Sequence, residues 1–174
     1  MNTTTPTDYT RSLESITRET AASLRECPES IVTWRPTAGA WSIKEIIGHL
    51  IDSAANNHQR FVRAEQQADL VFPGYAQDEW VRIQSYHSAP WNELVSLWES
   101  YNLHIARVMA AIPARIRDRK HAQHNFHHIG FREFSADEPV SLNDLMYDYV
   151  LHLQHHLAQV RERQRGAELA AQGA

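Results

Sequence analysis

The segment WNELVSLWESYNLHIARVMAAI, residues 91–112, decides the fold class of this protein. Large apolar side chains recur along it in alternating steps of three and four residues: Trp91, Leu94, Trp98, Tyr101, Ile105, Val108 and Ile112. This spacing places them on one face of an α-helix, which is the packing pattern of a helix bundle. Pro113 follows directly and is expected to end the helix.

Three further segments have the same apolar periodicity and are predicted to be helices: residues 6–27, 42–68 and 141–165. Gly166 is expected to cap the last helix, which would leave residues 166–174 as a frayed tail. The chain of 174 residues is therefore predicted to form one all-α domain, a four-helix bundle.

Capping residues support these helix starts. Thr5 can cap the first helix, and Pro6 suits its first turn. The sequence SIKE from Ser42 to Glu45 is a capping box. In such a box the serine side chain binds the backbone N–H of the glutamate, and the glutamate side chain binds the backbone N–H of the serine. The sequence SLND at Ser141 has the same form with an acidic residue in the third helical position.

Two long connections separate the helices, residues 69–89 and 113–140. A short helix is predicted near residues 77–87, and a short hairpin within residues 128–135. Connections of this length allow crossovers, so the sequence does not determine the order of the helices in the bundle.

Composition excludes several classes of function. The net charge is −4 with histidines neutral, and the basic residues are dispersed, so no nucleic-acid platform is expected. No apolar run approaches the roughly 18 residues of a membrane span, and the first residues do not resemble a signal peptide. Cys27 is the only cysteine, so the chain cannot form an internal disulfide, and a reducing cytoplasm is expected. Its place on the apolar face of the first predicted helix indicates a small buried core residue.

Eleven histidines are the unusual feature, and three of them occur in LHLQHHLAQ, residues 151–159. His152 and His156 are one helical turn apart on the side that continues the apolar row. His155 instead aligns with the polar residues of the helix. Because buried imidazoles need partners, and neutral imidazole is a common metal ligand, we predict that His152 and His156 bind a metal.

The third ligand is expected from another helix. His49 in IIGHLIDS is the best candidate, and it begins a polar stripe with Asp52, Ser53 and Asn56. This stripe is either a solvated flank or the wall of a cleft. In the second case Asp52 would lie near the metal and orient a ligand or carry protons, and His155 would lie beside the ligands as a second candidate catalytic residue.

Several known metal motifs are absent. An HExxH site needs glutamate where Leu153 stands, and no Glu-x-x-His of a di-iron bundle occurs. Three histidines without a fourth protein ligand resemble catalytic sites that keep one position open.

The remaining histidines have weaker signals. His104 is interpreted as a residue on the flank of its helix. The loop histidines His121, His124, His127 and His128 allow two interpretations: a rival metal site, or a lid over the cleft in which His127 or His128 carries protons.

The run AWSIKEIIGHLIDS (residues 40–53), followed about a hundred residues later by HLQHH (152–156), resembles the DinB/YfiT-like superfamily, most closely its YfiT-type branch. The resemblance covers residues 30–162 and implies a bacterial metal-binding four-helix bundle. It further implies that His49, His152 and His156 hold a divalent metal, nickel or zinc, whose open positions take water. The loop HNFHHIGFREF (124–134) departs from the shorter, proline-containing loop of that branch, so substrate class does not carry over.

Members of that superfamily include thiol-dependent S-transferases and isomerases, and proteins described as hydrolases. The expected function is accordingly a metal-dependent S-transferase that joins a small-molecule thiol to an electrophilic substrate. The alternatives are a hydrolase that uses metal-activated water and a metal-binding bundle without chemistry. The protein is expected in the cytoplasm, without nucleic-acid or membrane partners, and a homodimer is compatible with the sequence.

Overall fold

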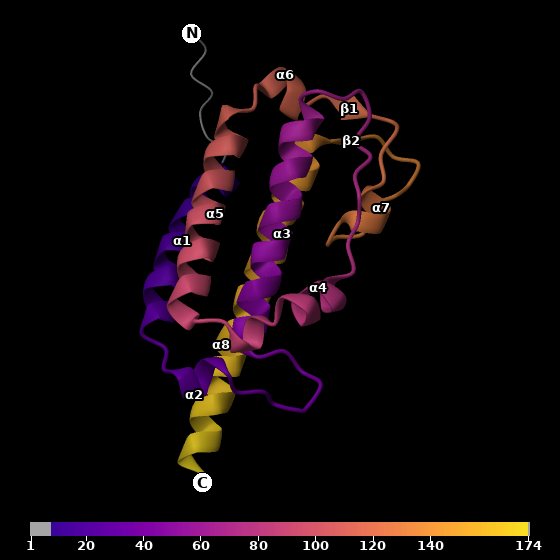
Figure 1. Ribbon diagram of the computed structural model, residues 1–174. Helices are drawn as coiled ribbons and strands as arrows, with labels where there is room; N and C mark the ends of the chain where they lie inside the picture. Colours follow the sequence, from indigo (N-terminus) through magenta and orange to yellow (C-terminus); the bar gives the residue numbers. More distant parts are fainter. Residues whose placement is uncertain (1–7, 174) are drawn as a thin grey trace.

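The computed structural model describes residues 8–173, so the predicted helix start at Thr5 and Pro6 lies outside the described residues. Four long helices form the bundle: α1 (Asp8–Arg25), α3 (Ile43–Ala64), α5 (Trp91–Ala111) and α8 (Leu142–Gln172) (Figure 1). The four-helix bundle predicted from the sequence is therefore confirmed.

The order of the helices, which the sequence left open, is now visible. Helix α5 packs between α1 and α3, and α8 closes the bundle against α3 and α1. Helices α3 and α5 run in the same direction, opposite to α1 and α8 (Figure 1). Because α3 and α5 are parallel neighbours, the connection between them travels the full length of the bundle, which explains why this linker is long.

The apolar seam of residues 91–112 faces the core as predicted. Trp98, Ile105 and Ile112 are completely buried, and Trp91 and Leu94 are nearly so. Trp98 and the α8 residue Tyr149 are among the largest fully buried side chains.

Both predicted capping boxes are present. Ser42 Oγ accepts a bond from the Glu45 N–H at 3.4 Å, and Glu45 Oε2 accepts one from the Ser42 N–H at 2.8 Å. Ser141 and Asp144 form the equivalent pair at 3.3 and 2.8 Å. At its other end, α3 stops at Ala64 rather than near Ala68.

The predicted end of the last helix is wrong. Helix α8 passes through Gly166 and continues to Gln172, so residues 166–172 are helical rather than frayed. The glycine instead provides space, because a Cβ at Gly166 would lie 2.7 Å from Cη2 of Trp34. Trp34 follows the short helix α2 (Glu29–Val32), which packs against α8.

The connection from α3 to α5 contains the predicted short helix, α4 (Gln77–Gln84), and then the 3-10 turn η1 (Tyr86–Ser88). The connection from α5 to α8 contains α6 (Ala114–Arg117), β1 (Lys120–His121), α7 (Phe126–Ile129) and β2 (Val140–Ser141). The predicted hairpin within residues 128–135 does not form. Instead β1 and β2, the two ends of this crossover, pair antiparallel.

The two long connections also bind each other. Leu70 N–H donates to the Gln123 carbonyl at 3.0 Å, and Asn125 N–H donates to the Leu70 carbonyl at 3.3 Å. The Asn125 side chain accepts from the Phe72 N–H at 3.1 Å and donates to its carbonyl at 2.8 Å. These bonds fix both connections beside α3 and α8, where they form one wall of a cavity. Within residues 8–173, no helix is long and apolar enough to cross a membrane.

Close packing at Gly48 generates a stability prediction. A Cβ there would lie 2.1 Å from the buried Tyr86 ring, so Gly48→Ala must displace that ring. We expect the variant to lower the free energy of unfolding by about 1–3 kcal/mol, although alanine by itself favours a helix over glycine by about 1 kcal/mol. Urea unfolding measures the change.

The matched control is Gly39→Ala, because nothing lies within 4 Å of a Cβ at that position. It is expected to change stability by less than about 0.5 kcal/mol. A Gly48→Ala variant as stable as the original protein would contradict the packing argument.

Candidate metal centre

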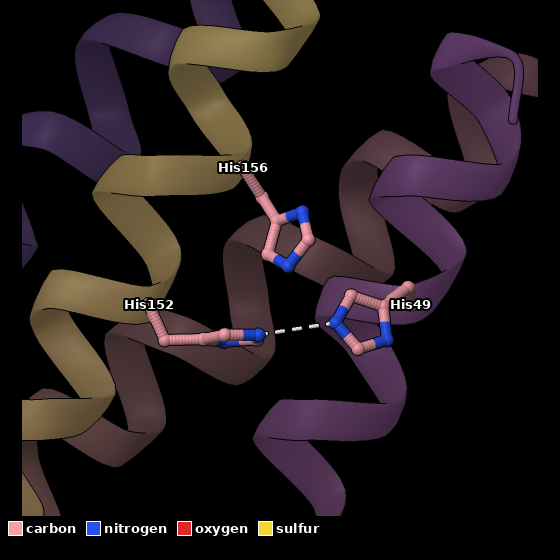
Figure 2. Close-up of side chains that lie close together, drawn as sticks. All are labelled: His49, His152 and His156. Carbon is pink, nitrogen blue, oxygen red and sulfur yellow. Dashed lines mark hydrogen bonds between the residues drawn. The ribbon is translucent and has the colours of Figure 1, made fainter. Parts of the chain in front are cut away.

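Three histidines from two helices converge between α3 and α8: His49 on α3, and His152 and His156 on α8 (Figure 2). One nitrogen from each ring lies within 4.8 Å of the others. The Nε2 atoms of His49 and His152 are 3.1 Å apart, and the ring centres of His152 and His156 are 4.5 Å apart. The structure thus brings together the three ligands predicted from the sequence.

Helix geometry explains this convergence. His152 and His156 project from successive turns of α8, so their rings stack along one side of it. Helix α3 runs antiparallel to α8 and places His49, which is completely buried, across from both (Figure 2).

Burial keeps these imidazoles neutral. Burial first, and the neighbouring histidines second, lower the pKa of His49 to about 3 and that of His152 to about 2. Burial also lowers the pKa of His156. Neutral rings are the form that binds metal ions, so protons do not compete for this site near neutral pH.

Neighbouring side chains orient two of the rings. Gln159 Oε1 lies 2.9 Å from Nδ1 of His156, and Gln159 Nε2 lies 3.1 Å from Nε2 of His155. An amide oxygen accepts, so His156 carries its proton on Nδ1 and turns the lone pair of Nε2 to the cluster. Ser53 Oγ lies 3.3 Å from Nδ1 of His152 and can accept the proton of this nitrogen when the ring binds a metal through Nε2.

The spacing fits a metal ion. Imidazole nitrogens at about 2.0–2.1 Å from a tetrahedral zinc ion are about 3.3 Å apart. The observed nitrogens, 3.1 Å apart for one pair and within 4.8 Å for all, enclose a space of this size. A cation there would replace the hydrogen bond between the Nε2 atoms of His49 and His152 and would accept a lone pair from each of the three rings. This donor set suits several divalent metals and does not choose among them.

A cavity of about 300 Å³ opens beside the cluster, and His152 and His156 form part of its wall. Phe131 forms another part, with its ring centre 5.5 Å from that of His152. The lining also includes polar residues that the sequence analysis did not select: Asn57, Arg60, Tyr75, Gln77 and Asp148.

Asp148 holds the crossover in place over this cavity. Its buried carboxylate accepts bonds from the N–H groups of Phe131 and Arg132, both at 2.8 Å, and from Arg132 Nε at 3.1 Å. The loop of residues 129–132 is therefore attached to the same helix that carries two of the histidines.

The two predicted catalytic residues have different positions. His155 is exposed at the cavity rim and connects to His156 through Gln159. Asp52 is buried, and its Oδ1 accepts bonds from Gln84 and Tyr86, both at 2.7 Å. Within residues 8–173 it has no hydrogen bond to a cluster histidine, so the predicted orienting role belongs to Ser53 and Gln159 instead.

The loop histidines do not form a rival metal site. His121 and His124 bind the backbone carbonyls of Ala68 and Glu138, at 2.7 and 3.0 Å. His127 and His128 are exposed and do not line the cavity. Within residues 8–173, the His49 cluster is the only group of three suitable ligands.

The other two residues that the sequence singled out also lie apart from the cluster. His104 pairs with His58 on the flank of the bundle, with 3.3 Å between the Nε2 atoms. Cys27 packs against the core but is only partly buried, rather than buried as predicted.

We predict that alanine at position 49, 152 or 156 lowers the affinity for Zn²⁺ by more than about 100-fold. Substitution of a residue that hydrogen-bonds to a metal ligand typically lowers the metal affinity by about 10–100-fold, and loss of the ligand itself should lower it more. Gln159→Leu should fall within that smaller range. Competition with a coloured chelator measures the affinities.

His128→Ala is the control for this series, because this exposed histidine lies outside the cavity. It should keep the original affinity. A ligand variant with unchanged affinity would remove that residue from the proposed set.

The histidines also predict how stability depends on pH. Unfolded histidines titrate near pH 6.5, whereas folded His49 and His152 have pKa values of about 3 and about 2. Between these values the unfolded state binds more protons, so lowering the pH destabilises the metal-free protein. The loss should approach about 1.4 kcal/mol per pH unit for each such histidine.

Urea unfolding of metal-free protein between about pH 7 and pH 5 tests this expectation. His152→Leu removes one of the three histidines and should make the pH dependence shallower. Equal slopes for the variant and the original protein would show that His152 accepts a proton in the folded state.

Comparison with known proteins agrees with this architecture. The family model of the DinB superfamily matches residues 12–160. The chain is 20% identical over 154 residues to "Putative metal-dependent hydrolase OB0413" of Oceanobacillus iheyensis, covering 88% of this chain and 82% of that protein. It is 23% identical over 128 residues to "Putative metal-dependent hydrolase YfiT" of Bacillus subtilis, covering 73% of this chain and 66% of that protein.

The fold has a counterpart among solved structures. YfiT from Bacillus subtilis, described as "a probable metal-dependent hydrolase with an unusual four-helix bundle topology", matches with a TM-score of 0.73 at 17% identity. The match covers 90% of this chain and 84% of that chain. Because the family model spans most of the sequence and the bundle has the same topology, the chain belongs to the DinB superfamily.

Proposed function

We propose that this protein is a metal-dependent S-transferase, which joins a small-molecule thiol to a small electrophile. The observation that carries the proposal is an open three-histidine cluster facing a cavity that contains no cysteine. A structural zinc site is closed by four protein ligands, whereas a catalytic site keeps a position for water or substrate. The access at this cluster therefore favours chemistry over a purely structural metal.

The nucleophile must come from outside the chain. Cys27, the only cysteine, lies at a separate cavity beside α8, where Gln164 Nε2 approaches its Sγ at 2.9 Å. Ser53 does line the site, but a His152 ring that coordinates through Nε2 carries its proton on Nδ1 and donates to the serine hydroxyl. Ser53 is thus a positioning residue and is not activated as a nucleophile.

A divalent metal bound by the three imidazoles supplies a Lewis acid with open positions, which lowers the pKa of a thiol or a water coordinated to it. His49, His152 and His156 hold it without adding charge, so its full positive charge is available. Gln159 and Ser53 keep two of these rings in the binding tautomer. Phe131 adds an apolar surface to the wall of the cavity next to His152.

In the transfer itself, the thiolate sulfur gives an electron pair to the electrophilic carbon. The bond from that carbon to the leaving group breaks, and the leaving group departs with the bonding electrons, while the proton lost by the thiol passes to solvent. His155, exposed at the rim, is the titratable group placed to carry this proton to solvent.

Hydrolysis is the second candidate, and the names of two relatives favour it, since both are called putative metal-dependent hydrolases. Water would then replace the thiol as nucleophile at the same site. The ligand histidines would serve both reactions, so their variants cannot separate the two.

Dependence on thiol separates these functions. With Zn²⁺ or Ni²⁺ bound, we expect the protein to consume an electrophile such as monochlorobimane only when a small thiol is added, with the thioether as product. Mass spectrometry identifies the product. The metal-free protein and the His49→Ala variant should show only the uncatalysed rate.

Hydrolysis of ester or amide substrates by the loaded protein without thiol, with no thioether formed when thiol is present, would contradict transfer and support the hydrolase.

A further inference from the structure

Arg60 is a buried cation in the wall of the same cavity. It is 5% exposed, and it lies about two turns beyond Ser53 on α3, or about 10 Å along the helix axis. Asp148 lies one turn before His152 on α8, so Arg60 and Asp148 mark the end of the cavity away from the cluster.

Among residues 8–173, the guanidinium of Arg60 has no ion pair or hydrogen bond with a carboxylate, although the nearby charge of Asp148 acts on it. Its Nη1 donates to Asn57 Oδ1 at 3.3 Å and its Nη2 donates to the Pro73 carbonyl at 3.0 Å, both neutral acceptors. Its Nε is buried without an acceptor in the part of the chain that the structure describes. A buried arginine normally has a carboxylate or phosphate as partner, because burying an unpaired charge is costly.

Nearby acidic groups do not fill this role. Both oxygens of Asp148 already accept bonds from the loop, and its ion pair is with Arg132. Asp52 points its Oδ1 to Gln84 and Tyr86 and does not line the cavity. The cluster histidines are neutral, as argued above, and burial raises the pKa of Tyr75 to about 12, so that it is neutral as well. Arg60 and Asp148 are therefore the charged groups that line this end of the cavity, and the charge of Asp148 is already compensated by Arg132, which leaves the charge of Arg60 without an ion pair.

We propose that Arg60 binds a carboxylate of a molecule that reacts at the three-histidine cluster. Its two neutral acceptors fix the planar fork, and its remaining N–H groups match the oxygens of a carboxylate. The reactive group and the carboxylate of that molecule are separated by several bonds, because the cluster and Arg60 occupy opposite ends of the cavity. This inference rests on the proposed function for the reaction, but the binding of a carboxylate by Arg60 does not depend on it.

Titration of metal-free protein with hexanoate by calorimetry tests the site directly, since no metal is present to bind the carboxylate. Arg60→Gln should weaken binding by about tenfold or more, because a charge-assisted hydrogen bond is lost. Arg60→Lys keeps the charge but lacks the planar guanidinium, so its affinity for hexanoate should lie between those of the original protein and Arg60→Gln. Arg63→Gln, an exposed arginine on the same helix, is the matched control and should bind as the original protein does.

Two further measurements identify the source of the carboxylate. With Co²⁺ bound, the absorbance of the bound thiolate measures the affinity for each thiol. The affinity for 6-mercaptohexanoate is compared with that for 6-mercaptohexanol, and the affinity for mercaptoacetate with that for mercaptoethanol. If the carboxylate belongs to the thiol, only the longer acid should bind about tenfold more tightly than its alcohol, and only while Arg60 is present. If it belongs to the electrophile, KM should rise in Arg60→Gln for a carboxylated electrophile and stay unchanged for a neutral one.

Equal affinity of the original protein and folded Arg60→Gln for hexanoate would overturn the proposal. If Arg60→Gln fails to fold, Arg60→Lys decides the question: unchanged hexanoate affinity together with lowered thermal stability would make Arg60 a structural residue. Failure of the thiol reaction alone would leave the hexanoate result intact and would affect only the proposed function.

Discussion

Burial of neutral imidazoles between α3 and α8 is the constraint on which the site depends. His49 is fully enclosed, and its Nε2 faces that of His152 at 3.1 Å, so neither ring accepts a proton near neutral pH. The surrounding apolar core of the bundle provides this desolvation. The same packing therefore stabilises the fold and presents three lone pairs to one point, where a metal can bind.

The long connections complete the site that the helices begin. The linker from α3 to α5 must travel the length of the bundle, because these two adjacent helices run in parallel, whereas the linker from α5 to α8 begins and ends at the same end of the bundle (Figure 1). One linker supplies Tyr75 and the other supplies Phe131, and the Asn125 side chain joins the two through Phe72. Asp148 then attaches the second linker to α8. As a result, the wall of the cavity is built from segments far apart in the sequence, and it is rigidly placed relative to the histidines.

Local sequence pattern was sufficient for the helices, the two capping boxes and the three histidines. These features follow from helical spacing, which places His152 above His156 and indicates the face of α3 that carries His49. The pattern was insufficient where the deciding contact is distant in sequence. The glycine at position 166 accommodates Trp34, and Asp52 binds Gln84 and Tyr86, none of which periodicity reveals.

The sequence does contain a pattern for the cavity-lining residues of α3, namely polar side chains at helical spacing, but part of the predicted stripe lies on a neighbouring face of the helix. The stripe predicted on α3 contained Asp52, Ser53 and Asn56 beside His49, whereas the face that lines the cavity continues through Ser53 and Asn57 to Arg60. Steps of four, four and three residues connect this second set. Similarly, periodicity placed His155 among the polar residues of α8 but did not show that Asp148 on this side is buried beneath the crossover.

The most direct test of the metal centre is X-ray absorption spectroscopy of the protein loaded with one equivalent of Zn²⁺. The account predicts three imidazole nitrogens at about 2.0–2.1 Å and a light-atom ligand from solvent that exchanges with added thiol. A first coordination shell with four protein ligands, or one without three imidazoles, would contradict the open three-histidine site.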